Sequence, residues 1–246
     1  RETASRVIAG AVAKQLLAAA GISFLGGVVQ IGAVCAGSYQ WDQVEQNELR
    51  CVDPQKVDAM RGEIEAARKL RDSVGGIVEV QAHGVMPGLG EPVFARLDAL
   101  IGGAMFSIPA VKGVEIGAGF SSAAMHGSAM HDEMFTDGFH TNNHGGVLGG
   151  LSSGAPIVVR AVVKPTASIA REQRTLNRDL AAAGIETKGR HDPCVAIRAV
   201  PVCEAMLALV LIDVLLQHQA ALGMRGFYSS PQSIQYGMAK DLTDGC

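Results

Sequence analysis

The segment that most constrains the fold is an almost unbroken apolar stretch between Pro201 and Leu222. Its Leu, Val, Ile and Met side chains would cover nearly every side of an α-helix, and such a helix must be buried in a core or an interface. Pro is favoured at the first helical position, so we expect Pro201 to open this helix. Glu204 would then lie in the first turn, where a negative charge suits the helix dipole.

Other elements follow from hydrophobic periodicity and from turn residues. Predicted helices cover residues 4–20, a segment that begins at Asp53-Pro54, and 93–105; predicted strands cover residues 28–34, 77–82, 111–116, 157–163 and 194–199. Their intervals do not repeat as regular strand–helix–strand units, which favours an α+β layered fold over a doubly wound parallel sheet. The polar residues 223–246 are expected to form a tail over the surface.

Charge and cysteine content exclude several classes of protein. The net charge of −3 argues against a general nucleic-acid binder. Residues 160–198 hold eight Lys/Arg and four Asp/Glu, which indicates either a local site for a small anion or an ordinary solvated surface. Five cysteines without a C-x-x-C motif do not form a disulfide framework and fit a reducing cytosol. The apolar residues 21–37 are too few to span a membrane.

Three short segments carry groups suited to chemistry. Gly145–Gly150 could present backbone amides to an anion or a flavin edge, although Gly-rich turns between strands are common. Lys164–Ser168 follows a predicted strand and offers an ammonium, two hydroxyls and backbone amides, which suit a phosphate or a polyol. In Gly189–Pro193, Arg190 could clamp an anion and Asp192 could move a proton, or the segment could be a capped turn.

Histidines are frequent between residues 126 and 144, at spacings that can suggest a metal site. The second pair, His140 and His144, lies in a Gly- and Asn-rich run, where helical spacing does not bring side chains together. We therefore expect no metal.

Taken together and in order, these motifs resemble chorismate synthase. The matching stretches are Arg1–Val7, Asp72–Gly76, Pro87–Phe94, Val111–Gly117, Asn142–Gly146, Lys164–Thr166, Gly189–Cys194 and the run from Arg198 into the Glu204 helix. The resemblance covers essentially the whole chain. It implies a β-α-β sandwich, in which antiparallel sheets enclose a helical layer, and a cytoplasmic homotetramer.

The resemblance also implies an activity. Chorismate synthases are lyases that convert 5-enolpyruvylshikimate 3-phosphate to chorismate, in aromatic amino acid biosynthesis, by an anti-1,4 elimination of phosphate. They require reduced FMN although no net redox change occurs. Some members regenerate the reduced flavin themselves, with NADP, and others rely on a flavin reductase; no nicotinamide fingerprint occurs in this sequence.

Site residues can be carried over by motif. The resemblance implies that FMN is held by Lys164, Pro165, Thr166, Ala167 and Ser168. It further implies that Gly149 and the Pro109-Ala110 backbone line the flavin, that Arg190 lies at flavin and substrate, and that Asp192 lies near the reactive flavin nitrogen and assists proton transfer.

This sequence departs from the family's pattern in two ways. The N-terminal part of the family, with two histidine motifs and substrate-binding arginines, does not occur in it, so residues 1–246 are expected to form one N-terminally truncated chorismate-synthase-like domain. Ala118 stands where the family often has an acidic residue, which questions one local contact. The alternatives are a non-catalytic homologue that binds FMN or serves as an assembly scaffold, and a metal-dependent hydrolase.

Overall fold

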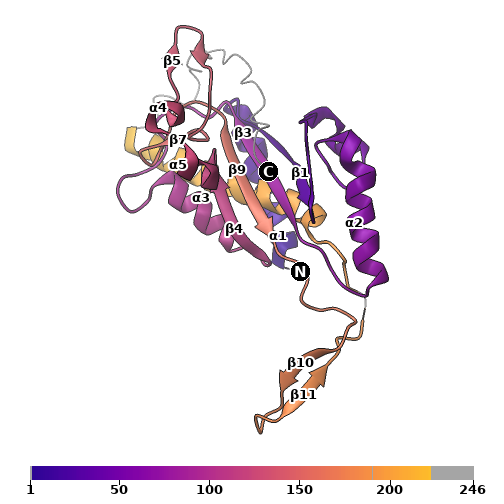
Figure 1. Cartoon of the computed structure of the whole chain (residues 1–246). Helices are drawn as coiled ribbons and strands as arrows, with labels where there is room; N and C mark the ends of the chain where they lie inside the picture. The colour runs from indigo at the N-terminus through magenta and orange to yellow at the C-terminus, as the bar shows by residue number, and fades with distance from the viewer. Residues whose placement is uncertain (1, 190, 223–246) are drawn as a thin grey trace.

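A five-stranded antiparallel sheet forms the centre of the protein in the computed structural model, which describes residues 2–189 and 191–222 (Figure 1). The strand order is β2-β1-β3-β9-β4. These strands span Val34–Cys35, Ser23–Ile31, Gly76–His83, Ile157–Val163 and Val111–Ile116 in that order. Alternate side chains of β3 and β9 are fully buried, as expected for strands with one face on a core.

Three helices form a layer on this buried face. They are α1 (Glu2–Ala19), α3 (Leu97–Phe106) and α5 (Ala196–Leu222). α5 packs on β1 and β3 and contacts both other helices, so the predicted apolar helix is the centre of the core. The axes of α1 and α5 approach closely where Gly10 meets Ala205, and Lys14 forms an ion pair with Glu204 nearby.

α5 is also long and apolar enough to cross a membrane by length and composition. However, 56% of its apolar window is buried inside the protein, so these properties are weak evidence for a span. A core helix passes the same test, and the contacts of α5 with the sheet are those of a core helix.

The start of α5 corrects the prediction for residues 194–199, which are not a strand. α5 begins at Ala196, and Pro201 and Glu204 lie inside it, beyond its first turn. The β-branched run suggested a strand, but the buried residues Ala196, Ala199, Val200 and Cys203 recur at helical spacing. Their burial offsets the backbone hydrogen bond that Pro201 removes.

The observed ends of other elements differ from the predicted ones by a few residues. β1 begins five residues before the predicted strand and ends at Ile31, and Gly32, with a φ of 55°, turns the chain into β2. α3 begins at Leu97, four residues late. At the Asp53-Pro54 start, a short 3-10 helix (Pro54–Lys56) leads into α2 (Val57–Lys69), and the Asp53 carboxylate accepts the Gln55 N–H at 3.0 Å. The helix over 4–20 and the strands over 77–82, 111–116 and 157–163 are confirmed.

Short elements and one projecting hairpin complete the described chain. The short elements are 3-10 helices Trp41–Gln46 and Gly119–Ala124, helix α4 (Gly127–Met130), and the two-stranded pairs β5 (Met134–Phe135) with β6 (Gly138–Phe139) and β7 (Val147–Leu148) with β8 (Leu151–Ser152). β10 (Gln173–Leu176) and β11 (Ala182–Ile185) form a ribbon, which we call the arm, that projects away from the sheet (Figure 1). The sequence did not predict it.

The α+β prediction, with antiparallel strands against a helical layer, is confirmed. In the described part of the chain, the strands outside the five-stranded sheet form only two-stranded ribbons.

Candidate functional site

The end of β9 and the start of β4 bring the first predicted site residues together. Val163 and Val111 are paired across the two strands. Immediately beyond them, the N–H of Lys164 donates to the carbonyl of Ala110 at 2.9 Å. Ala110 has a φ of 73°, in the left-handed region that few residues adopt without tertiary support. The sheet register therefore fixes Pro109-Ala110 next to Lys164.

The segment before α5 completes this group. The Thr166 hydroxyl donates to the carbonyl of Asp192 at 3.2 Å, and the Ser73 hydroxyl donates to the carbonyl of Thr166 at 2.7 Å. The N–H of Val74 donates to the carbonyl of Pro193 at 2.8 Å. Segments far apart in the sequence thus meet where the arm leaves the body. We call the group of Ala110, Lys164, Thr166 and Asp192 the strand-end site.

The charged groups here come from different elements. Lys164 is half-buried, and its Nζ lies 3.4 Å from the carbonyl of Pro165. Within residues 2–189 and 191–222, no carboxylate forms an ion pair with this ammonium. The Asp192 carboxylate pairs with Arg198, from the first turn of α5, with Nη1 3.0 Å from Oδ2. Arg171 pairs with Asp72 across the root of the arm at 3.5 Å.

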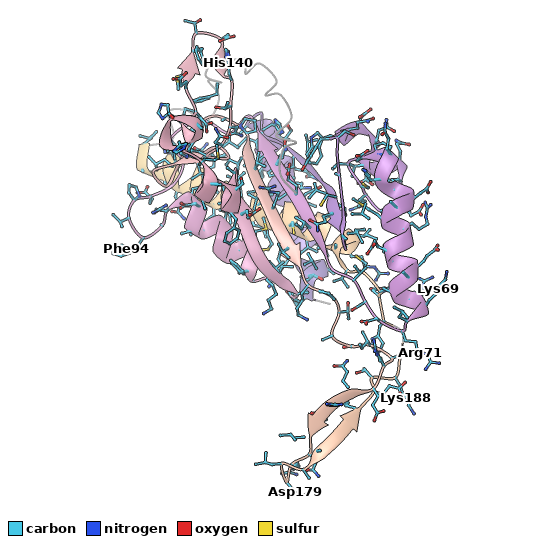
Figure 2. All side chains as sticks on the ribbon, viewed as in Figure 1. Lys69, Arg71, Phe94, His140, Asp179 and Lys188 are labelled. Carbon is cyan, nitrogen blue, oxygen red and sulfur yellow. The ribbon has the colours of Figure 1, made fainter. Side chains whose placement is uncertain are left out.

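Figure 2 shows the same junction, with Lys188 at the root of the arm and Arg71 on the adjacent body, while Asp179 marks the tip of the arm. An ammonium, a hydroxyl and left-handed backbone are groups that bind a phosphate. A half-exposed carboxylate beside them can take up or release a proton. The strand-end site therefore brings groups suited to anion binding next to a residue whose carboxylate is suited to proton transfer.

Comparison with known proteins shows which family the chain belongs to. A model of the family described as chorismate synthase matches residues 1–216. The chain belongs to the chorismate synthase family. A solved structure, "Crystal Structure of Chorismate Synthase", is 36% identical with a TM-score of 0.73. The match covers 89% of this chain and 63% of that one, so this chain spans less than two thirds of the length of that chorismate synthase.

Not all of the residues expected from the chorismate synthase resemblance lie in the strand-end site. Gly149 is in the β7–β8 turn, and the adjacent Gly150 carbonyl accepts the N–H of Leu97 at the start of α3. This turn lies at the opposite end of β9, a seven-residue strand about 20 Å long. Within one chain, Gly149 is therefore not brought to Lys164.

The remaining residues named from the resemblance lie between Thr166 and the arm, or lie outside the described residues. Ala167 and Ser168 connect Thr166 to the arm, and the Ala167 carbonyl accepts from the Gln173 side chain at 3.3 Å. Arg190 lies outside the described residues, and its role stays a prediction. The Nε2 of His191, the next residue, is buried and has no hydrogen-bond partner among the described residues.

Two residues that contact the strand-end site received no role from the sequence. Ser73 holds the backbone of Thr166, and Arg198 holds the carboxylate of Asp192. Both lie in stretches that match the family. However, no local spacing signals either contact: Ser73 and Thr166 are 93 residues apart, and the second contact depends on where α5 begins.

The Gly-rich run of the sequence is a buried, internally bonded loop. The Asp132 carboxylate accepts the N–H groups of Asn143 at 2.7 Å and His144 at 2.8 Å, and the N–H of Gly146 donates to the Asn142 side chain at 2.8 Å. In the part of the chain that the structure describes, no three His, Cys, Asp or Glu side chains cluster in a way that could hold a metal ion.

A second polar cluster lies on the face of the sheet away from the helices. Glu79 is 5% exposed at the centre of β3 and accepts from Gln81 at 2.7 Å. Burial raises the pKa of the Glu79 carboxyl, and the charge of Arg160 on β9 opposes this shift only in part. Arg160 also pairs with Glu115 of β4 at 3.2 Å, so the cluster ties the three strands together.

Proposed function

We propose that this protein acts in the synthesis of chorismate, by the anti-1,4 elimination of phosphate from 5-enolpyruvylshikimate 3-phosphate in aromatic amino acid biosynthesis. Family membership supports the reaction. The observation that carries it in this chain is the strand-end site, where Lys164, Thr166 and Asp192 come together from segments far apart in the sequence. A cation and a carboxylate at one point suit a reaction that loses an anion and a proton.

We infer that the cofactor is reduced FMN, held by Lys164–Ser168 with the backbone of Pro109 and Ala110. The donors fit the group, because the Lys164 ammonium has no carboxylate partner among the described residues and the Thr166 and Ser168 hydroxyls follow it on one half-buried segment. When bound, the flavin would lend electron density to the allylic system as phosphate leaves. Lys164 would balance the charge of the cofactor phosphate.

Asp192 is proposed as the proton-transfer group and Arg190 as an anion-binding group beside it. The Asp192 backbone is held from both sides, by Thr166 at its own carbonyl and by Val74 at the next carbonyl. A carboxylate on a fixed backbone can hold or move a proton at one position of the cofactor, which is the geometry that general acid–base catalysis requires.

The family also motivates the remaining proposals. The protein would be one domain over residues 1–246, act in the cytoplasm and assemble as a homotetramer. Reduced FMN would come from a flavin reductase, or from reduction by the enzyme itself with NADP as the carrier.

Anaerobic turnover with reduced FMN tests the proposal. Chorismate formation by the protein is expected. Asp192→Asn should abolish it while leaving the FMN dissociation constant largely unchanged. Asp179→Asn is the matched control, because it removes the same charge at the tip of the arm (Figure 2). Full activity of Asp192→Asn would refute the assigned role, and absence of both turnover and FMN binding in the parent protein would refute the proposed function.

A further inference from the structure

We infer that Arg198 is a positioning residue, which holds the Asp192 carboxylate in one orientation at the strand-end site. This inference rests on the proposed function for the importance of Asp192, but the contact itself does not. Arg198 Nη1 lies 3.0 Å from Asp192 Oδ2, so the two side chains form an ion pair.

The backbone around Asp192 is already fixed without Arg198. Thr166 donates to the carbonyl of Asp192 at 3.2 Å, and Val74 donates to the next carbonyl at 2.8 Å. These bonds set the position of the Asp192 Cα but leave the side-chain torsions free. Among the described residues, the ion-pair partner of the Asp192 carboxylate is Arg198. The contact with Arg198 supplies the missing restraint.

Arg198, the ion-pair partner of Asp192, belongs to a rigid helix. Arg198 lies in the first turn of α5, where its N–H and that of Ala199 both donate to the carbonyl of Val195 at 3.1 Å. α5 is the centre of the core, so the base of the Arg198 side chain is held by the whole fold.

The exposure of the Arg198–Asp192 ion pair limits how much kcat should fall when Arg198 is lost. The Arg198 side chain is 72% exposed and that of Asp192 is 35% exposed, so water weakens the pair. We therefore expect loss of Arg198 to lower kcat by about two- to fivefold rather than to abolish turnover. Fold stability and the FMN dissociation constant should not change, because the Arg198 side chain is largely exposed.

The test uses Arg198→Met, which removes the charge, and Arg198→Lys, which keeps it. Arg171→Met is the matched control, since it breaks the other ion pair at the root of the arm, with Asp72 at 3.5 Å, without touching Asp192. The first readout is the carboxyl carbon resonance of Asp192 in the cofactor-free protein, assigned by its loss in Asp192→Asn. It should move in Arg198→Met and stay nearly in place in the Lys variant and in the control.

The second readout is anaerobic turnover. Arg198→Met should lower kcat about two- to fivefold, whereas Arg171→Met should leave kcat unchanged. An unmoved carboxyl resonance in Arg198→Met, or a kcat of Arg198→Met equal to that of the parent, would overturn the inference. Full turnover of Asp192→Asn would instead refute the proposed role of Asp192, while the resonance would still decide whether Arg198 positions it.

Discussion

A single methyl group added at the crossing of α1 and α5 should destabilise the protein. A Cβ at Gly10 would collide with the Cβ of Ala205 and lie 2.5 Å from its Cα. The obstacle includes backbone, so the two helices would have to move apart. Overpacking of this kind costs about 1–3 kcal/mol, and the collision with backbone places Gly10→Ala near the upper end of that range.

The higher helix propensity of Ala offsets part of this loss. Replacing Gly by Ala inside a helix is favourable by about 0.5–1 kcal/mol, because Ala loses less conformational entropy on folding. The net loss expected for Gly10→Ala is therefore about 2 kcal/mol. In a protein of this size, that should lower the melting temperature by about 4–8 °C.

Gly62→Ala in α2 is the matched control. Nothing lies within 4 Å of a Cβ at Gly62, so the same change should stabilise the protein and raise its melting temperature by about 1–4 °C. Adding Ala205→Gly to Gly10→Ala should recover part of the loss, because it removes one of the two colliding atoms. Thermal and urea unfolding of all variants measure these effects. A Gly10→Ala protein as stable as the parent would refute the close crossing of the two helices.

Three further predictions concern charge. Lys164→Ala should weaken FMN binding at least tenfold with an unchanged melting temperature, as measured by flavin titration; the exposed Lys112→Ala is the control, and an unchanged FMN dissociation constant would contradict the cofactor assignment. Burial raises the pKa of the Glu79 carboxyl above its ordinary value of 4.5, so stability falls as the pH rises from that value through the raised pKa. Glu79→Gln should therefore gain stability relative to the parent as pH increases. This expectation is refuted if urea unfolding gives the same difference in free energy of unfolding between variant and parent at every pH from 5 to 8. Asp132→Ala leaves two loop N–H groups without their acceptor and should cost about 1–3 kcal/mol in urea unfolding. Asp137→Ala, which loses only an exposed contact with His140, should destabilise much less, and equal stability of these last two variants would contradict the role of Asp132 in the loop.

Elements with a clear local period were predictable. The alternation of apolar residues over 77–82 and 157–163 and the Ala-rich helix over 4–20 were confirmed, because burial of one face imposes the period on the sequence. The interval 194–199 was misassigned for the converse reason. Its β-branched residues favour a strand locally, and only packing against the core makes it the first turns of α5.

The candidate site was predictable as a set of motifs but not as a geometry. Lys164 and Asp192 were singled out from the residues and from the resemblance, and the structure brings them together through Thr166. Gly149 followed from the same resemblance and lies at the other end of β9 within the chain. The roles of Ser73 and Arg198 could not be predicted, since each depends on a contact between elements.

The sequence by itself determined the family, the periods of the main elements and the central, buried helix, because these properties are recorded residue by residue in side-chain type. Tertiary structure alone decided which of those elements meet. The register of β4 on β9 sets Ala110 beside Lys164, and the packing of α5 sets where Arg198 reaches Asp192. Such contacts depend on the burial of distant surfaces, whose free energy is shared over the whole core and leaves no local signal.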